Sequence, residues 1–150
     1  MATKFVYKME NILSIKYKIE DQAKTAYGFA RMKLTEEEDK LLTLKNKIIL
    51  YQERKKSLML SRLKLLEIRK CEEAIEITKH FIEQQQIAVK KAEKQLESAR
   101  LRLNAAMQDR KTHEKLKENA LTNFFNEYEA DQRKEIDELI SFRYNNPTDY

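Results

Sequence analysis

The sequence contains almost none of the residues that usually form turns. Among its 150 residues there is one glycine, Gly28, and one proline, Pro147. Because these two residue types form most tight turns and interrupt strands, the composition excludes a fold built from many short strands and loops. The single cysteine, Cys71, cannot form a disulfide within the chain and is typical of a reducing compartment.

Long apolar runs are also missing. No stretch approaches the ~20 apolar residues that a membrane-spanning helix needs. The opening segment MATKFVYKMENIL has neither an apolar core nor a small-residue cleavage site, so we expect no secretion signal there. The net charge is only +5 and the opposite charges are interleaved, which disfavours a nucleic-acid-binding protein with one basic face.

What is present is a high content of charged residues, 37% against a usual value of about a quarter, with apolar residues repeating every seven positions. This spacing predicts coiled-coil helices. The second half has two rows: Ile68, Ile75, Ile82, Val89, Leu96 and Leu103, and Cys71, Thr78, Gln85, Ala92, Ala99, Ala106, His113 and Ala120. The first half has Leu34, Leu41 and Ile48 in one row and Leu44, Tyr51, Leu58 and Leu65 in the other, preceded by Phe5, Met9, Ile12, Ile19, Ala23, Ala26 and Ala30. The step from Ala26 through Ala30 to Leu34 predicts a stutter.

We therefore predict an all-α fold of two long helices that form an antiparallel coiled-coil hairpin in a single rod-like domain. The first helix should cover about residues 4–66, the turn should lie within 57–76, the second helix should cover about residues 70–144, and residues 145–150 should form a short tail. Basic residues within 4–18 would then face acidic residues within 127–138, which favours antiparallel over parallel pairing. An antiparallel dimer of straight helices stays open as an alternative.

Two registers between the helices fit the sequence pattern. In antiparallel pairing, the numbers of facing residues have a constant sum. A sum of 147 sets Phe5 against Phe142, and a sum of 133 sets Tyr51 against Ile82. Both registers pair large side chains with small or apolar ones, as close packing requires.

The sequence offers little material for an active site. His80 and His113 are far apart, Cys71 has no neighbouring metal-ligand spacing, and no Gly-rich loop is present to bind phosphate. We expect a packed seam position for His113 and no catalytic residue, no metal site and no cofactor.

Two surfaces are candidates for binding. Basic residues surround the expected turn, where they form either a solubilising tip or a docking end for an acidic protein: Arg54, Lys55, Lys56, Arg62 and Lys64, with Arg69 and Lys70. Aromatic residues gather near both chain ends, where they either pack on each other or contact a partner: Phe5, Tyr7, Phe124, Phe125, Tyr128, Phe142 and Tyr144.

Several segments resemble the flagellar export protein FliJ family. These are KFVYKMENILSIKYKIEDQAK at the start, the Leu41–Leu44–Ile48–Tyr51 pattern, HFIEQQ at 80–85, RKTHEKLKE at 110–118 and EADQRKEIDELISFR near the end. The resemblance covers essentially the whole chain. It moves the expected turn towards the earlier part of the window and favours the sum of 133.

The resemblance implies a function that the residue pattern alone does not. Members of this family are similar to the central stalk of rotary ATPases; they activate the hexameric flagellar type III export ATPase, contact the export gate protein FlhA and escort substrate chaperones. The protein would then be cytoplasmic and peripheral at the inner membrane. Contact with the ATPase ring would involve Phe5, Met9, Ile12, Leu139 and Phe142, and contact with the gate would involve Leu44, Ile48, Tyr51, Phe81, Gln85 and Ala88. Two other functions stay open, a structural coiled-coil scaffold and a prefoldin-like holdase chaperone.

Overall fold

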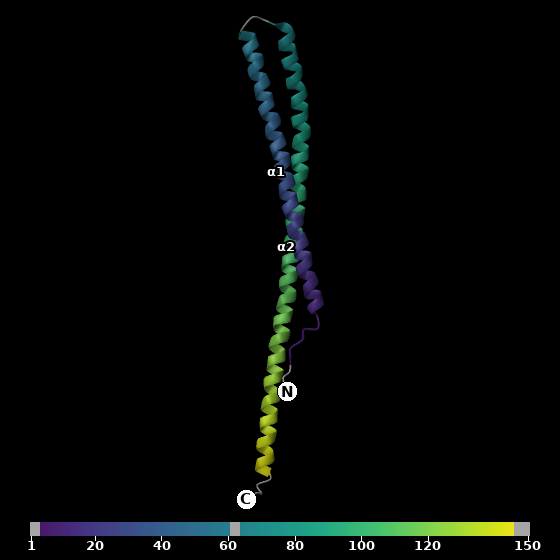
Figure 1. Ribbon diagram of the computed structural model, residues 1–150, viewed down its shortest axis with the longest axis vertical. Helices are drawn as coiled ribbons and strands as arrows, with labels where there is room; N and C mark the ends of the chain where they lie inside the picture. Colours follow the sequence, from purple (N-terminus) through teal and green to yellow (C-terminus); the bar gives the residue numbers. More distant parts are fainter. Residues whose placement is uncertain (1–3, 61–63, 146–150) are drawn as a thin grey trace. The chain divides into compact units, whose positions relative to one another are not determined.

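The chain folds into two long helices. A computed structural model describes residues 4–60 and 64–145, and within them it contains α1, Glu10–Leu60, and α2, Leu65–Asn145, with no strand (Figure 1). The two helices pack against each other in opposite directions. The prediction of an all-α antiparallel hairpin is confirmed.

The helix bounds differ from the expected ones by a few residues. α1 begins at Glu10 rather than near residue 4, after a turn in which the Glu10 N–H donates to the Tyr7 carbonyl at 3.2 Å. It ends at Leu60, and α2 already begins at Leu65, five residues before the expected start. The connection includes residues 61–63, which lie outside the described residues, as does the expected tail beyond Asn145.

The chain divides into two compact units. One consists of residues 21–105 and contains the ends of the two helices that adjoin the connection; we call it the hairpin unit. The other consists of residues 1–20 and 106–150; we call it the terminal unit. No helix in the described part of the chain is both long and apolar enough to cross a membrane.

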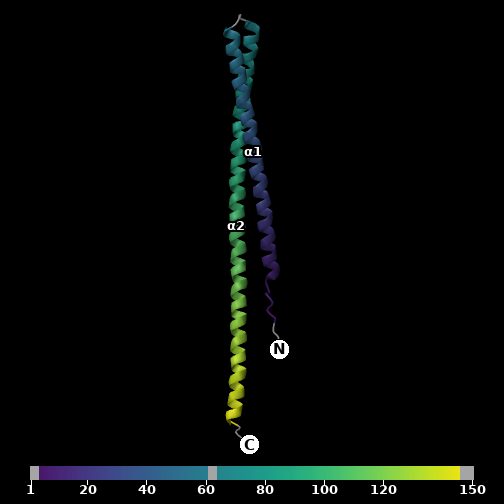
Figure 2. The same cartoon turned by 60° about the vertical axis from the view of Figure 1, so that its left-hand side comes forward.

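Figure 2 shows the two antiparallel helical segments of the hairpin unit. Apolar side chains between these segments form a seam. The rows predicted for α2 are confirmed there, since every member from Ile68 to Leu103 is buried or half-buried. From α1, the seam receives Leu34, Leu41, Leu44, Ile48, Tyr51 and Leu58. The helix pair is thin, and the core is a single file of layers, as expected for a two-stranded coiled coil.

The first part of α1 does not follow the predicted row. Within the hairpin unit Ala23, Tyr27, Ala30 and Leu34 are half-buried at a regular heptad spacing, with half-buried Gly28 beside Tyr27. Ala26 is exposed, so the predicted stutter is wrong.

The register also differs from both predicted values. In the hairpin unit Lys55 pairs with Glu72 at 3.2 Å and Gln85 donates to Glu37, so paired numbers sum to 127 and 122. The sum of 147 is wrong, and the sum of 133 is 6 to 11 too high for these two pairs. Shifts by whole heptads leave the apolar pattern unchanged, so the pattern alone could not distinguish these registers.

The terminal unit pairs only a short stretch of α1 with α2. Leu13 is 3% exposed and forms its apolar centre, and the rings of Phe5 and Phe124 lie 5.4 Å apart. The prediction that Phe5 faces Phe142 is therefore wrong, and Phe142 is 66% exposed. Residues 125–145 of α2 are exposed throughout, so acidic residues within 127–138 do not face residues 4–18.

In the terminal unit, the row predicted for the start of α1 is wrong. Met9, Ile12 and Ile19 are exposed, whereas Leu13 and Glu20 are buried. The seam is thus shifted by one position from the apolar row read in the sequence. The shift places the Glu20 carboxylate at the interface between the helices. A carboxylate buried there requires a partner on α2.

Candidate functional site

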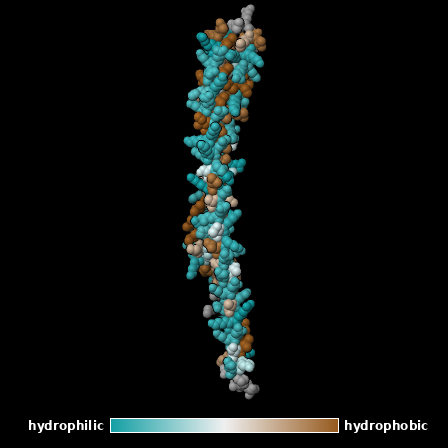
Figure 3. Space-filling model, turned by 180° about the vertical axis from the view of Figure 1, so that it is seen from behind, coloured by the Kyte–Doolittle hydropathy of each residue, from teal (hydrophilic) through white to brown (hydrophobic). Residues whose placement is uncertain are grey.

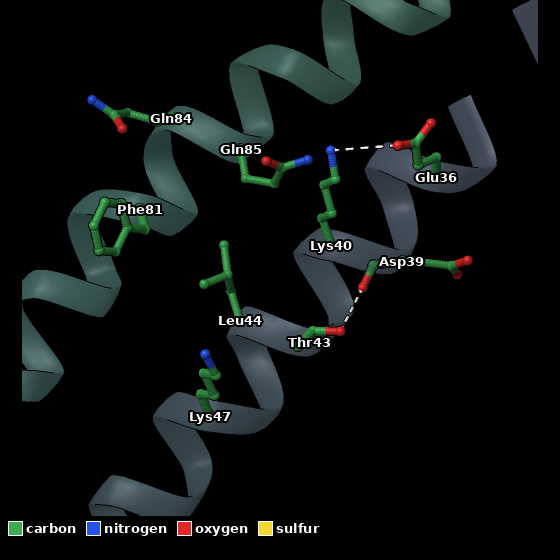
Figure 4. A pocket seen from close by; sticks show the side chains of 9 residues that line it. All are labelled: Glu36, Asp39, Lys40, Thr43, Leu44, Lys47, Phe81, Gln84 and Gln85. Atoms are coloured by element: carbon green, nitrogen blue, oxygen red, sulfur yellow. Dashed lines mark hydrogen bonds and ion pairs between the residues drawn. The ribbon is translucent and has the colours of Figure 1, made fainter. Parts of the chain in front are cut away.

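An open groove crosses the two helices of the hairpin unit. Its volume is about 710 Å³, and it is lined by Glu36, Asp39, Lys40, Thr43, Leu44 and Lys47 of α1 and by Phe81, Gln84 and Gln85 of α2 (Figure 4). Leu44 and Phe81 form its apolar part, while charged side chains of α1 form its rim. Neighbouring turns of both helices thus present one concave surface.

A buried polar layer lies beside the groove. The Gln85 amide donates to the Glu37 carbonyl at 2.9 Å and to the Glu37 carboxylate at 2.5 Å. Lys33 lies 2.9 Å and Lys40 3.5 Å from the same carboxylate, whose residue is 6% exposed. The hydrogen bond from Lys33, followed by that from Gln85, lowers the pKa of Glu37 to about 2. Glu37 is therefore ionised at neutral pH and holds Gln85 in place across the seam.

The groove combines an apolar centre with a charged rim, as protein-binding sites do. Phe81 is 49% exposed and adjoins half-buried Leu44, which suits an apolar anchor from a partner. Lys40 is committed to Glu36 at 3.6 Å, and the Thr43 hydroxyl donates to the Asp39 carbonyl at 2.9 Å (Figure 4). Neither interaction pairs a nucleophile with a general base.

Three of the six residues predicted to contact the gate lie together in the structure. Leu44, Phe81 and Gln85 line the groove together. Ile48 and Tyr51 are half-buried seam residues and Ala88 is half-buried on α2; none of the three is in its lining.

The predicted ring-contact set is divided between two places in the terminal unit. Phe5 packs on Phe124, and Met9 and Ile12 follow on α1 with exposed side chains. Leu139 lies fifteen residues beyond Phe124 on α2, which is about 22 Å at the rise of an α-helix. These residues therefore form two groups rather than one surface.

An ionic network at the seam of the terminal unit was not predicted from the sequence. Arg110 Nε and Nη2 donate to the two carboxylate oxygens of Glu20 at 2.6 and 3.2 Å, and Nη1 donates to Glu114 at 3.1 Å. The Tyr17 hydroxyl donates to the other Glu114 oxygen. The hydrogen bond to Glu20 raises the pKa of Arg110, and the one to Glu114 raises the pKa of Tyr17.

Further ion pairs flank this network. Lys16 lies 2.8 Å from Asp109 and lowers the pKa of its carboxyl, and Lys117 lies 2.8 Å from Glu10. His113 is half-buried at its predicted seam position, with Nε2 3.5 Å from Asp109. The signal that could have found this network is the heptad spacing from Leu13 through Glu20, because a polar residue at a seam position needs a partner on the facing helix.

The basic residues predicted at the turn have different environments. Arg54, Lys56 and Lys64 are exposed, whereas Lys55 is half-buried and paired with Glu72. Arg62 lies outside the described residues. Cys71 is buried in the seam.

Comparison with known proteins identifies the family. The sequence model of the flagellar FliJ protein matches residues 5–148, which is nearly the whole chain. Comparison with curated proteins and with solved structures gives no match. The chain therefore belongs to the flagellar FliJ protein family and is a component of the flagellar export apparatus.

Proposed function

We propose that this protein is a non-enzymatic stalk and activator of the flagellar export ATPase ring. In this role it couples the ring to the export gate protein FlhA and escorts the chaperones of export substrates. It works in the cytoplasm, peripherally associated with the inner membrane. The observation that carries the proposal is the family match across residues 5–148.

The helical hairpin supports a role in which the protein acts by binding its partners rather than by catalysis. A two-helix coil presents long helical faces that neighbouring proteins can bind. ATP hydrolysis then belongs to the ring, and this chain changes its rate by binding.

For the gate, we assign the groove of the hairpin unit as the contact site. Leu44, Phe81 and Gln85 lie together there, and the charged rim can orient a partner before the apolar centre is covered. Ile48, Tyr51 and Ala88 would act by supporting these side chains from the seam and its flank.

For the ATPase ring, we assign the exposed α2 segment 125–145, with Leu139 and Phe142 as anchors. Both side chains are about two-thirds exposed. Phe5, Met9 and Ile12 would form a second contact group at the start of α1.

The decisive experiment titrates this protein into the cognate export ATPase and measures the hydrolysis rate against stoichiometry. A stalk increases the rate and saturates at a fixed ratio to the hexamer. The Leu139→Ser/Phe142→Ser variant should reduce this stimulation, while Phe29→Ser, an equally exposed substitution in the hairpin unit, should not. A structural scaffold would neither stimulate hydrolysis nor co-elute with the ATPase.

The gate contact is tested separately by binding to the soluble part of FlhA. Phe81→Ala should weaken this binding. Ile77→Ala is the matched control, because Ile77 lies one turn earlier on α2, is similarly exposed and does not line the groove. Equal effects of the two variants would contradict the assignment.

A further inference from the structure

The ends of the two helices at the connection carry an unusual set of side chains. We define the tip as residues 54–60 of α1 with residues 64–70, which include Lys64 and the start of α2. These segments contain six Lys or Arg residues and one Glu. Their net charge therefore equals the +5 of the whole chain.

Most of this charge is accessible. Lys55 is paired with Glu72 at 3.2 Å, so its charge is largely compensated. The other basic side chains of the tip are exposed: Arg54, Lys56, Lys64, Arg69 and Lys70. Such a concentration of one sign at a helix-pair end attracts an anionic surface.

Large apolar side chains lie among these charges. Leu60 is 87% exposed and Leu65 is 75% exposed, and Met59 and Leu66 are more than half exposed. Figure 3 shows apolar surface bordering the connection at this end of the hairpin unit. The seam does not use these side chains, because Leu58 and Ile68 fill the last seam positions on the two helices.

The residue types favour a lipid surface over a protein surface. Protein interfaces are enriched in aromatic residues and depleted in Lys, and Leu is rare among their energetic centres. The sequence has no Phe, Tyr or Trp between Tyr51 and Phe81, a range that includes the tip. The exposed residues of the tip are chiefly Lys, Arg and Leu. Lys or Arg next to exposed Leu is the composition of segments that lie in the headgroup region of anionic membranes.

We propose that the tip docks onto an anionic lipid bilayer, with Leu60 and Leu65 in the interfacial region and the surrounding Lys and Arg at the lipid phosphates. The apolar face of such segments is buried about 5–10 Å into the boundary between headgroups and acyl chains. The aliphatic parts of Lys and Arg side chains can cover apolar surface while their charged groups stay hydrated. This inference does not depend on the proposed role at the ATPase.

The experiment uses the full chain and two kinds of vesicle, pure phosphatidylcholine and phosphatidylcholine with one third phosphatidylglycerol. Co-sedimentation should show binding to the anionic vesicles only, and binding should weaken as salt is raised, because screening lengths fall below about 10 Å above 0.1 M salt. Lys56→Glu/Lys64→Glu should weaken binding at least about tenfold. Lys90→Glu/Lys91→Glu changes the net charge equally, at exposed sites away from the tip, and should change binding less than about twofold.

A fluorescent probe tests the apolar part. The chain has no tryptophan, so Leu60→Trp provides a single reporter. Its emission should shift to shorter wavelength on anionic vesicles, whereas Phe29→Trp, an exposed site elsewhere in the hairpin unit, should not shift. Circular dichroism checks that all variants stay helical.

Three outcomes would overturn the proposal. The first is equal binding to both vesicle types, and the second is an effect of Lys90→Glu/Lys91→Glu as large as that of the tip variant. The third is failure to bind either vesicle while poly-L-glutamate is bound through the tip, which would indicate an acidic protein surface as the occupant.

Discussion

The hairpin unit and the terminal unit use the same two helices but different interactions. In the hairpin unit the seam is formed mostly by apolar residues such as Leu41, Ile48 and Ile75. In the terminal unit the interface combines buried Leu13 and the contact of Phe5 with Phe124 with ion pairs around Arg110 and Lys16. Apolar burial is little affected by salt, whereas partly exposed ion pairs are weak and screened. We therefore expect the terminal unit to open more readily.

This difference suits the proposed division of work. A stable hairpin unit keeps the groove and the tip in fixed geometry. A less stable terminal unit can rearrange its short α1 segment when the exposed part of α2 is bound, since elements that move on binding come from regions of low local stability.

The largest expected effect is the loss of an apolar seam residue from the hairpin unit. Ile75 is 7% exposed, so Ile75→Ala leaves a cavity and should lower the free energy of unfolding by about 2–4 kcal/mol. Urea denaturation followed by circular dichroism measures this. Ile77→Ala, two residues away and 56% exposed, should change it by less than about 0.5 kcal/mol. Similar losses for both variants would show that the seam is not where the structure places it.

The next effect should be confined to the terminal unit. Arg110→Ala removes both hydrogen bonds to Glu20 and the one to Glu114, and it leaves a buried carboxylate with less compensation. Amide hydrogen exchange should accelerate in residues 10–20 and 106–124 while the hairpin unit keeps its protection. Lys111→Ala, an exposed neighbour, should leave exchange unchanged. Acceleration across both units would show that they unfold together.

The comparison also explains what could be predicted from the sequence. The heptad rows of α2 were predicted correctly, because Ile68, Ile75 and Val89 repeat at a spacing that a helix places on one face. The start of α1 was not, because the predicted row contains Ile19, which is exposed, whereas the buried seam position belongs to Glu20. Apolar pattern alone fails where a polar group is buried with a partner.

The apolar pattern could not determine the register between the two helices for a related reason. Apolar layers repeat every heptad, so each shift by seven gives a similar fit. The buried polar contacts, Gln85 with Glu37 and Arg110 with Glu20, occur once each and distinguish one register from its neighbours. Their pairing depends on three-dimensional contact and could not be inferred from spacing.

The candidate binding sites were predicted only in part. Leu44, Phe81 and Gln85 were named together from family resemblance, and the groove unites them. Phe5 and Phe142 were brought together by a wrong register. Among the exposed leucines of the tip, Leu65 was wrongly placed in a seam row, and Leu60 and Leu66 were not assigned to any surface.

Acid should affect the polar layer of the hairpin unit. The folded pKa of Glu37 is about 2, below its ordinary value of 4.5. A group whose pKa is lowered by folding stabilises the fold above its unfolded pKa, and this contribution is lost as the pH falls through the folded pKa. Stability should thus decrease between about pH 4.5 and pH 2.

Thermal unfolding of the wild type and of Glu37→Gln across this range provides the measurement. The variant has no carboxyl at this position to protonate, so its midpoint should change less with pH. Glu36→Gln removes an exposed carboxyl one residue away and should keep the pH dependence of the wild type. Parallel curves for the wild type and Glu37→Gln would show that other carboxylates cause the acid sensitivity.

The smallest expected effect has the opposite sign. Gly28 lies within α1 in the hairpin unit, and no atom lies within 4 Å of the position that an added Cβ would take. Alanine is favoured over glycine in a helix by about 0.5–1 kcal/mol, so Gly28→Ala should raise the free energy of unfolding by about that amount. Ala26→Gly, at an exposed position two residues earlier, should lower it by a similar amount. Hydrogen exchange should slow in the hairpin unit alone, since the added stability acts on α1 there; slower exchange in residues 106–124 as well would show that the two units share one unfolding transition.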